Sequence, residues 1–185
     1  MDAGAFNGDT IAEFEAACNN SNICYEKIYG FEPDTENFLA LKSNFKGSEN
    51  KELVNRGLYS SSMVLNFEES TSSASLGAGT ARIVNNEVST QEGFVQIKTI
   101  SLDEFLDGAK VTFIKMDIEG AELEALYGAR DIIAKYKPKL AISVYHQRDD
   151  ILDIPCFIKE LCPEYKFYLR HYSNFITETV LFATV

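Results

Sequence analysis

The sequence has no tryptophan and only two histidines, and its 17 lysines and arginines are outnumbered by 28 aspartates and glutamates. The resulting net charge of -11 argues against a nucleic-acid-binding protein, because binding a duplex requires basic side chains that neutralise phosphates. No apolar run approaches the roughly eighteen residues that span a bilayer. The sequence also lacks a basic segment followed by an apolar run, the pattern of a secretory signal. We therefore expect a cytoplasmic protein with no nucleic-acid partner and no membrane span.

Cysteine is also scarce, with four residues that form two equally spaced pairs: Cys18 with Cys24, and Cys156 with Cys162. The spacing is not that of zinc ligands, and two histidines offer little to complete such a site. Reduced, mostly buried thiols are the simpler expectation. A chain of 185 residues that is 45% apolar and 24% charged fits one globular domain over 1–185.

Short apolar runs alternate with stretches of helical periodicity along most of the chain. The pattern predicts strands at 25–31, 111–117, 140–145, 165–170 and 179–184, and helices at 9–18, after Pro33, at 120–134 and at 150–161. Asn7 or Asp9 is the expected N-cap of the first helix. Alternation of strand and helix favours a mostly parallel sheet with right-handed crossovers.

Residues 58–100 break this rhythm. Two segments, MVLNF and FVQIKTI, have the pattern of antiparallel strands, and a segment rich in serine and glycine separates them. We interpret 58–100 as a β-rich insertion within the domain. Gly77-Ala78-Gly79 is not interpreted as a phosphate loop, because no apolar strand precedes it and no helix follows.

A glycine-containing loop, with Gly4 and Gly8, lies directly before the first predicted helix. Glycines let the backbone approach a ligand, and a helix start offers free N–H groups. The spacing differs from that of dinucleotide oxidoreductases.

Glu32, at the end of the next predicted strand, is placed to accept hydrogen bonds from ribose hydroxyls. Alternatively Glu32, or Asp34, interacts with the start of the following helix. Together the two motifs favour a cofactor that contains a nucleoside.

A second acidic motif follows the strand predicted at 111–117. Asp117 would project at the carboxyl edge of the sheet, where doubly wound folds bind ligands. Lys115, Asp117 and Glu119 share a face if the strand continues that far. The alternative is that Asp117 caps the next helix and that Lys115 neutralises it in a buried pair. We favour a functional role for Asp117.

These motifs resemble a known family. The segments DAGAFNGDT, YGFEPD and above all IKMDIEGAELEAL followed by KPKLAISVYH are similar to the FkbM family of S-adenosylmethionine-dependent methyltransferases, over essentially the whole chain. The resemblance implies the class I methyltransferase fold, a doubly wound, Rossmann-like α/β sheet. It also implies S-adenosylmethionine as cofactor and methylation of a hydroxyl on a sugar, glycolipid or small metabolite.

The resemblance implies roles for individual residues: Asp2, Gly4 and Gly8 in the cofactor loop, Glu32 on the ribose, Asp117 near the charged end of the cofactor, and Glu119, Glu122 and His146 on the acceptor side. A hydroxyl acceptor must lose its proton to a base or a metal-bound group. We expect His146 as the base, with Asp117 as the second catalytic residue. A histidine satisfied by backbone groups is the alternative. A magnesium ion held by Asp117 and Glu119 is a less favoured alternative, and we predict no metal site. His171 is expected to be structural or at the rim.

The chain departs from the family pattern at its start, since only Met1 precedes the position where a buried first strand would end. We expect the first strand to be missing, leaving a gap in the sheet with unpaired backbone groups. A fragment, or a strand supplied by a partner chain, would explain this. We further expect low stability or weak cofactor binding, and a higher melting temperature when upstream native residues are added. Two other functions stay open: a non-catalytic or decayed cofactor-binding module, and a nucleotide-dependent oxidoreductase.

Overall fold

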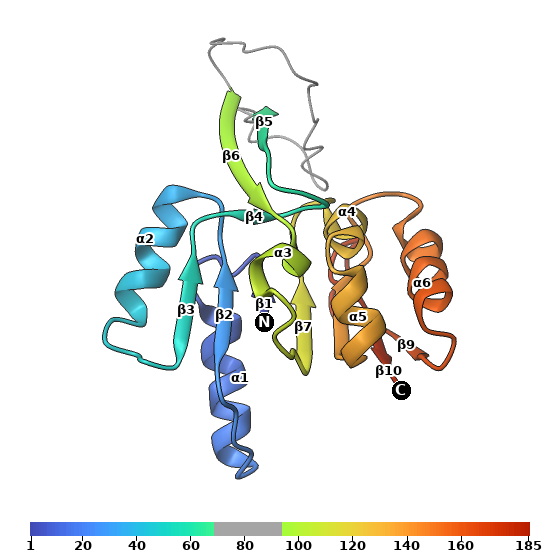
Figure 1. The fold of residues 1–185 in the computed structure, drawn as a ribbon, viewed down its shortest axis with the longest axis horizontal. Helices are drawn as coiled ribbons and strands as arrows, with labels where there is room; N and C mark the ends of the chain where they lie inside the picture. The colour runs from blue at the N-terminus through green and yellow to red at the C-terminus, as the bar shows by residue number, and fades with distance from the viewer. Residues whose placement is uncertain (69–93) are drawn as a thin grey trace.

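The computed structural model describes residues 1–68 and 94–185 (Figure 1). Gly77-Ala78-Gly79 and the serine-rich segment around it lie outside these residues. In the described part of the chain, a seven-stranded sheet has the order β3-β2-β1-β7-β8-β10-β9. Its strands are β1 (Asp2–Ala3), β2 (Ile28–Phe31), β3 (Lys51–Val54), β7 (Phe113–Met116), β8 (Lys139–Ser143), β9 (Lys166–His171) and β10 (Thr179–Thr184).

The sheet is mostly parallel, as the alternation of strands and helices predicts. Strands β3, β2, β1, β7 and β8 run parallel to their neighbours, while β10 is antiparallel to both β8 and β9. The chain winds outward from β1 to β3 on one side and from β7 to β8 on the other. Consequently the topological switch point, where ligands bind in such folds, lies between β1 and β7.

Helices cover both faces of the sheet. They are α1 (Asp9–Asn20), α2 (Thr35–Asn44), α3 (Leu102–Leu106), α4 (Glu122–Tyr127), α5 (Arg130–Tyr136) and α6 (Asp150–Leu161). One apolar cluster packs α1 and α2 against Ile28, and a larger cluster packs α3 to α6 against residues such as Phe31 and Ile114. Alternate residues of a strand point to opposite faces, so β2 contributes to both clusters. None of the helices in the described residues is long and apolar enough to cross a membrane.

The predicted insertion forms a small sheet of its own, which projects beyond the carboxyl edge of the main sheet (Figure 1). It consists of β4 (Gly57–Leu58), β6 (Phe94–Ile100) and β5 (Val64–Glu68), in that order. The antiparallel pairing of β5 with β6 confirms the prediction from MVLNF and FVQIKTI. Parallel pairing of β4 with β6 connects this sheet to the end of β3.

Several local expectations need correction. The single helix predicted at 120–134 is two helices. The Asp103 backbone N–H bonds to the Gly128 carbonyl oxygen, and the Asp103 carboxylate accepts from the first N–H groups of α5, those of Asp131 and Ile132. The N-cap of α1 is Gly8, while the Asn7 side chain accepts a hydrogen bond from the Asp9 backbone N–H. The four cysteines are free, but only Cys18 and Cys162 are buried, so the thiols are not mostly buried.

Two residues of the first strand are present, which corrects the expectation that the whole strand is missing, although unfilled space lies before them. Asp2 and Ala3 pair with β2 on one side and with β7 on the other. The Met1 ammonium group donates to the Phe113 carbonyl oxygen at 2.8 Å. Beyond Met1, between β2 and β7, lies a cavity of about 830 Å³ whose lining includes Phe14, Ile28 and Phe113. We call this cavity the amino-edge slot.

Candidate active site at the carboxyl edge of the sheet

The glycine loop of residues 4–8 connects β1 to α1 and rests on the end of β7. Gly4 has φ 74°, and a Cβ atom there would lie 1.9 Å from the Asp117 carbonyl oxygen. The backbone N–H groups of Gly4 and Ala5 both donate to the Phe31 carbonyl oxygen at 3.0 Å. The loop is therefore held between the ends of β2 and β7, and glycine is required at position 4 because no side chain fits.

Glu32 follows β2 directly and is 5% exposed. One carboxylate oxygen, Oε2, accepts from the Phe6 backbone N–H at 2.8 Å, and Oε1 accepts from that of Asp34 at 2.9 Å. Burial raises the pKa of Glu32, and these two N–H donors oppose the rise. Asp34 caps α2, since its Oδ1 accepts from the Asn37 N–H at 2.8 Å. Glu32 thus ties the glycine loop to β2 and keeps acceptor capacity on both oxygens.

The Asp2 carboxylate lies away from the other predicted site residues. It is buried, accepts a hydrogen bond from the Thr10 hydroxyl, and pairs with Lys115 Nζ at 3.0 Å. Burial raises the pKa of Asp2, and the Lys115 charge opposes this. Lys115 Nζ also donates to the Gly4 carbonyl oxygen at 2.9 Å. The interpretation of Lys115 as the partner of Asp117 is therefore wrong: it supports the glycine loop from the side of the amino-edge slot, which it lines with Asp2.

Asp117 follows β7 and presents a side chain that is 36% exposed. Its backbone N–H donates to the Ala3 carbonyl oxygen at 3.1 Å, which fixes it beside the glycine loop. Its Oδ1 accepts from the Tyr145 hydroxyl at 3.2 Å. Burial and the neighbouring Asp117 charge raise the pKa of Tyr145, so this hydroxyl stays protonated and donates. Asp117 does not cap the next helix, since α4 has no side-chain cap.

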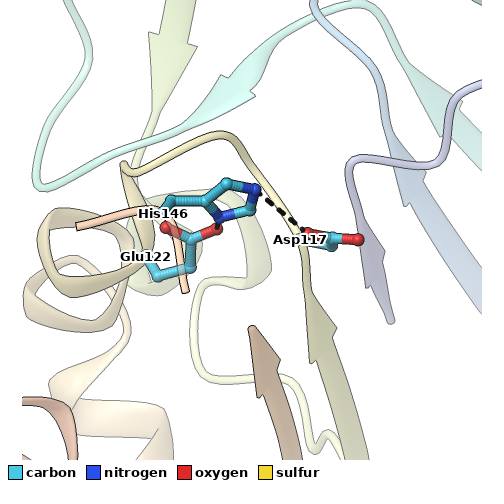
Figure 2. Close-up of side chains that lie close together, drawn as sticks. All are labelled: Asp117, Glu122 and His146. Atoms are coloured by element: carbon cyan, nitrogen blue, oxygen red, sulfur yellow. Dashed lines mark hydrogen bonds and ion pairs between the residues drawn. The ribbon is translucent and has the colours of Figure 1, made fainter. Parts of the chain in front are cut away.

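His146 lies between carboxylates of two other elements, as Figure 2 shows for Glu122 and Asp117. Its Nδ1 is 2.9 Å from Oε1 of Glu122, a fully buried side chain that also accepts from the Ile118 N–H at 2.8 Å. Its Nε2 is 3.6 Å from Asp117 Oδ1 and 3.5 Å from Glu119 Oε2. The ring nitrogens therefore face carboxylates, and the interpretation that backbone groups satisfy this histidine is wrong.

Two opposing effects act on the pKa of His146. Burial by itself lowers it, but the hydrogen bond with Glu122 and the negative charges of Glu122, Glu119 and Asp117 outweigh burial. The net pKa lies above the ordinary value of histidine. An imidazole in this setting accepts a proton readily and is stabilised once it is charged.

Glu119 reaches His146 from a tight turn. Both Glu119, with φ 57°, and Gly120, with φ 95°, have left-handed backbone conformations. A Cβ atom at Gly120 would lie 2.4 Å from the Gln147 side chain, so the turn packs against the segment after β8. The expectation that Lys115, Asp117 and Glu119 share one face fails because β7 ends at Met116.

Asp117, Glu122 and His146 each present one possible metal-ligand atom, and these atoms lie within 4.8 Å of one another. However, Oε1 of Glu122 already accepts from the Ile118 N–H and lies at hydrogen-bond distance from Nδ1 of His146. Hydrogen bonding accounts for this arrangement more fully than a cation would. His171 is exposed on β9, where Nδ1 lies 2.8 Å from the Thr179 hydroxyl.

Sequence reasoning missed Tyr145 and Asp150. The position of Tyr145, next to His146 at the end of a strand, was the available signal. Asp150 is the first residue of α6 and accepts from the Gln147 N–H at 3.0 Å. Burial and the nearby Glu122 charge raise the pKa of Asp150 to about 6. This carboxyl group steadies the segment that carries His146.

The carboxyl ends of β1, β2, β7 and β8 thus bring together the glycine loop, Glu32, Asp117 and His146. All four lie at one edge, around the switch point between β1 and β7. Glycine-loop backbone and a strand-end carboxylate suit a nucleoside ligand. Beside them, an imidazole held by carboxylates can accept a proton from a bound hydroxyl.

Comparison with known proteins agrees with this geometry. The family model for the methyltransferase FkbM domain matches residues 2–172. The chain is 38% identical over 112 residues to the hexuronic acid methyltransferase AglP of Haloferax volcanii, covering 57% of this chain and 43% of that protein. It is also similar to the crystal structure of methyltransferase FkbM from Methylobacillus flagellatus, with a TM-score of 0.74 and 28% identity, over 98% of this chain and 42% of that one.

A more distant structure shares the fold alone. A Streptococcus mutans protein in complex with S-adenosylhomocysteine superposes with a TM-score of 0.55 and 13% identity, over 100% of this chain and 86% of that one. Such neighbours establish the class I methyltransferase fold for this chain. The chain spans less than half the length of AglP and of the Methylobacillus protein.

Proposed function

Since this chain belongs to the FkbM methyltransferase family, we propose that it transfers a methyl group from S-adenosylmethionine to a hydroxyl group of a saccharide or related metabolite. The observation that carries the proposal is the meeting of the glycine loop, Glu32, Asp117 and His146 at one edge of the sheet. The name of the Haloferax relative, a hexuronic acid methyltransferase, supports a sugar acid as the acceptor class.

The ends of β1, β2 and β7 would hold the cofactor. The backbone of the glycine loop would contact its methionine part, and the free acceptor sites of Glu32 would bind the ribose hydroxyls. Backbone N–H groups of Phe6 and Asp34 hold the Glu32 carboxylate in place. The sulfonium is attracted to the negative charge of Asp117.

The proposed reaction breaks the bond between sulfur and the methyl carbon and forms a bond between that carbon and the acceptor oxygen. The hydroxyl proton moves to Nε2 of His146. The products are S-adenosylhomocysteine, a methyl ether and an imidazolium that returns its proton to water. Holding donor and acceptor in line supplies much of the rate, and the base supplies roughly 10²–10⁴-fold.

Calorimetric titration with S-adenosylhomocysteine tests the cofactor assignment. We expect the unmodified chain to bind, Glu32→Ala to lose binding, and Glu32→Gln to weaken it. Glu36→Ala is the matched control, because Glu36 is exposed on the adjoining helix and should leave binding unchanged. Thermal melting establishes that each variant is folded.

A folded chain that ignores S-adenosylhomocysteine would contradict the proposal. Binding of a nicotinamide dinucleotide in its place would favour an oxidoreductase. Binding of S-adenosylmethionine with no methyl transfer to uronic acids or other hydroxyl acceptors would favour a non-catalytic module.

A further inference from the structure

We propose that Glu122 is the positioning residue of the methyl-transfer site: it holds His146 with the proton on Nδ1, so that Nε2 is free to accept the hydroxyl proton. This inference rests on the proposed function. It follows from a single carboxylate oxygen, Oε1 of Glu122, which lies 2.9 Å from His146 Nδ1 and accepts from the Ile118 N–H at 2.8 Å.

The burial of Glu122 needs an explanation beyond packing. The side chain is 0% exposed, and a carboxylate without water is unfavourable unless charges or donors compensate it. Its second oxygen, Oε2, is buried without a hydrogen-bond partner. Within the described residues, the ion pair recorded for Glu122 is with His146. An apolar side chain could fill the same space, but it would leave both the Ile118 N–H and Nδ1 of His146 without their acceptor.

The hydrogen bond determines which ring nitrogen carries the proton. An ionised carboxylate only accepts, so Nδ1 of His146 must donate to Glu122. The lone pair of the neutral ring is then on Nε2, on the side of Asp117 and Glu119, where Figure 2 shows the ring facing Asp117. This is the side on which the proposed acceptor binds.

Glu122 also joins the two halves of the site. It is the first residue of α4, and its bond to the Ile118 N–H holds the turn that follows Asp117. His146 belongs to the segment after β8. One buried carboxylate therefore sets the position of the proposed base relative to the proposed sulfonium site. Misplacement of a base by a fraction of an ångström is costly when the reacting atoms must be aligned.

The charge of the site is conserved during the proposed step. The methyl group leaves the sulfonium with the bond's electron pair staying on sulfur, while His146 gains a proton and becomes a cation. Glu122, Glu119 and Asp117 therefore face one positive charge before the step and one after it. Among the residues that the structure describes, Asp150 from α6 and Tyr145 from the end of β8 are also near the ring.

The test uses Glu122→Gln, which keeps the shape of the side chain and removes its charge. Glu124→Gln, on the same helix, is the matched control, and Glu122→Asp is the conservative variant. Proton–nitrogen correlation NMR of the full chain reports the protonated ring nitrogen of His146 and its pKa. We expect the proton on Nδ1 in the unmodified chain, a lower His146 pKa in Glu122→Gln, and values near the unmodified ones in Glu124→Gln and Glu122→Asp.

Methyl transfer to glucuronic acid as the probe acceptor gives the second readout. We expect Glu122→Gln to reduce kcat by about 10²-fold with little change in S-adenosylhomocysteine affinity, and to move the rise of activity with pH to lower pH. Because the two residues act as a unit, Glu122→Gln in a His146→Gln background should have almost no further effect.

A proton on Nε2 in the unmodified chain, or a His146 pKa that Glu122→Gln leaves unchanged, overturns the inference. So does methyl transfer by Glu122→Gln at the unmodified rate. Failure of the proposed function is visible separately, as a folded, unmodified chain that does not bind S-adenosylhomocysteine, and it removes the catalytic role of Glu122 as well.

Discussion

The carboxyl and amino ends of the same three strands, β2, β1 and β7, differ in how closely the chain packs around them. At the carboxyl end, the N–H groups of Gly4 and Ala5 bond to Phe31, and that of Asp117 bonds to Ala3. At the amino end, β1 stops at Asp2, and the slot of about 830 Å³ separates β2 from β7. The difference teaches that added atoms should destabilise the filled carboxyl end and stabilise the unfilled amino end.

The largest effect on stability is expected from adding a side chain at Gly4, where the carboxyl end of the sheet leaves room only for glycine. Gly4→Ala forces a Cβ atom into the Asp117 carbonyl group. We therefore expect the free energy of unfolding to fall by about 3–5 kcal/mol and cofactor binding to be lost. Gly47→Ala is the matched control, because Gly47 also has positive φ, at 83°, but no atom lies within 4 Å of its added Cβ. Urea unfolding of both variants measures the difference. Equal losses would show that backbone strain alone, and not contact with Asp117, makes glycine necessary at position 4.

A smaller effect is expected from filling the amino-edge slot. An extension of four residues before Met1, alternating between apolar and polar side chains, would continue β1 between β2 and β7. Its apolar side chains would cover Phe14 and Phe113. Ladder hydrogen bonds and apolar burial should add about 2–3 kcal/mol, or roughly 5–10 °C in Tm by scanning calorimetry. A glycine-serine extension of equal length is the control. If both extensions act alike, the slot does not accept a strand.

A pH-dependent effect, no larger than that of the extension, concerns the Met1 ammonium group at the slot. Burial lowers the pKa of the Met1 amine from 8.0 to about 6, so the unfolded chain binds more protons between these values and stability should rise with pH across that window. The full rise is about 2–3 kcal/mol at most. Acetylation keeps the N–H that bonds to Phe113 and removes the charge. The pH dependence of unfolding free energy, compared between free and acetylated chains, isolates this group from His146 and Asp150, and identical slopes would contradict the assignment.

The fold could be predicted from the sequence because its units are local. Apolar runs at 111–117 and 140–145 and helical periodicity at 150–161 identify β7, β8 and α6 without tertiary information. The break between α4 and α5 could not be predicted in this way. At the break, Asp103 from an earlier part of the chain bonds to the Gly128 carbonyl oxygen and to the first N–H groups of α5.

The sequence predicts which residues gather at the candidate site, but it does not predict which side chains pair with one another there. The nearness of Asp117 and His146 follows from the adjacency of two parallel strands, which their order along the chain implies. The partner of Lys115 does not follow, because it depends on the register that places Asp2 opposite Lys115. Likewise, the local sequence does not indicate that the Glu122 side chain points inward to His146. A glutamate in the first turn of a helix often faces solvent.

The contact between Gly4 and the Asp117 carbonyl group also limits how this domain can diversify. Any side chain at position 4 displaces the end of β7, and with it the whole turn that carries Asp117 and reaches Glu122. Glu119, whose side chain is 74% exposed, has no such constraint on its side chain. Substitutions there should therefore leave the contact between the glycine loop and β7 intact.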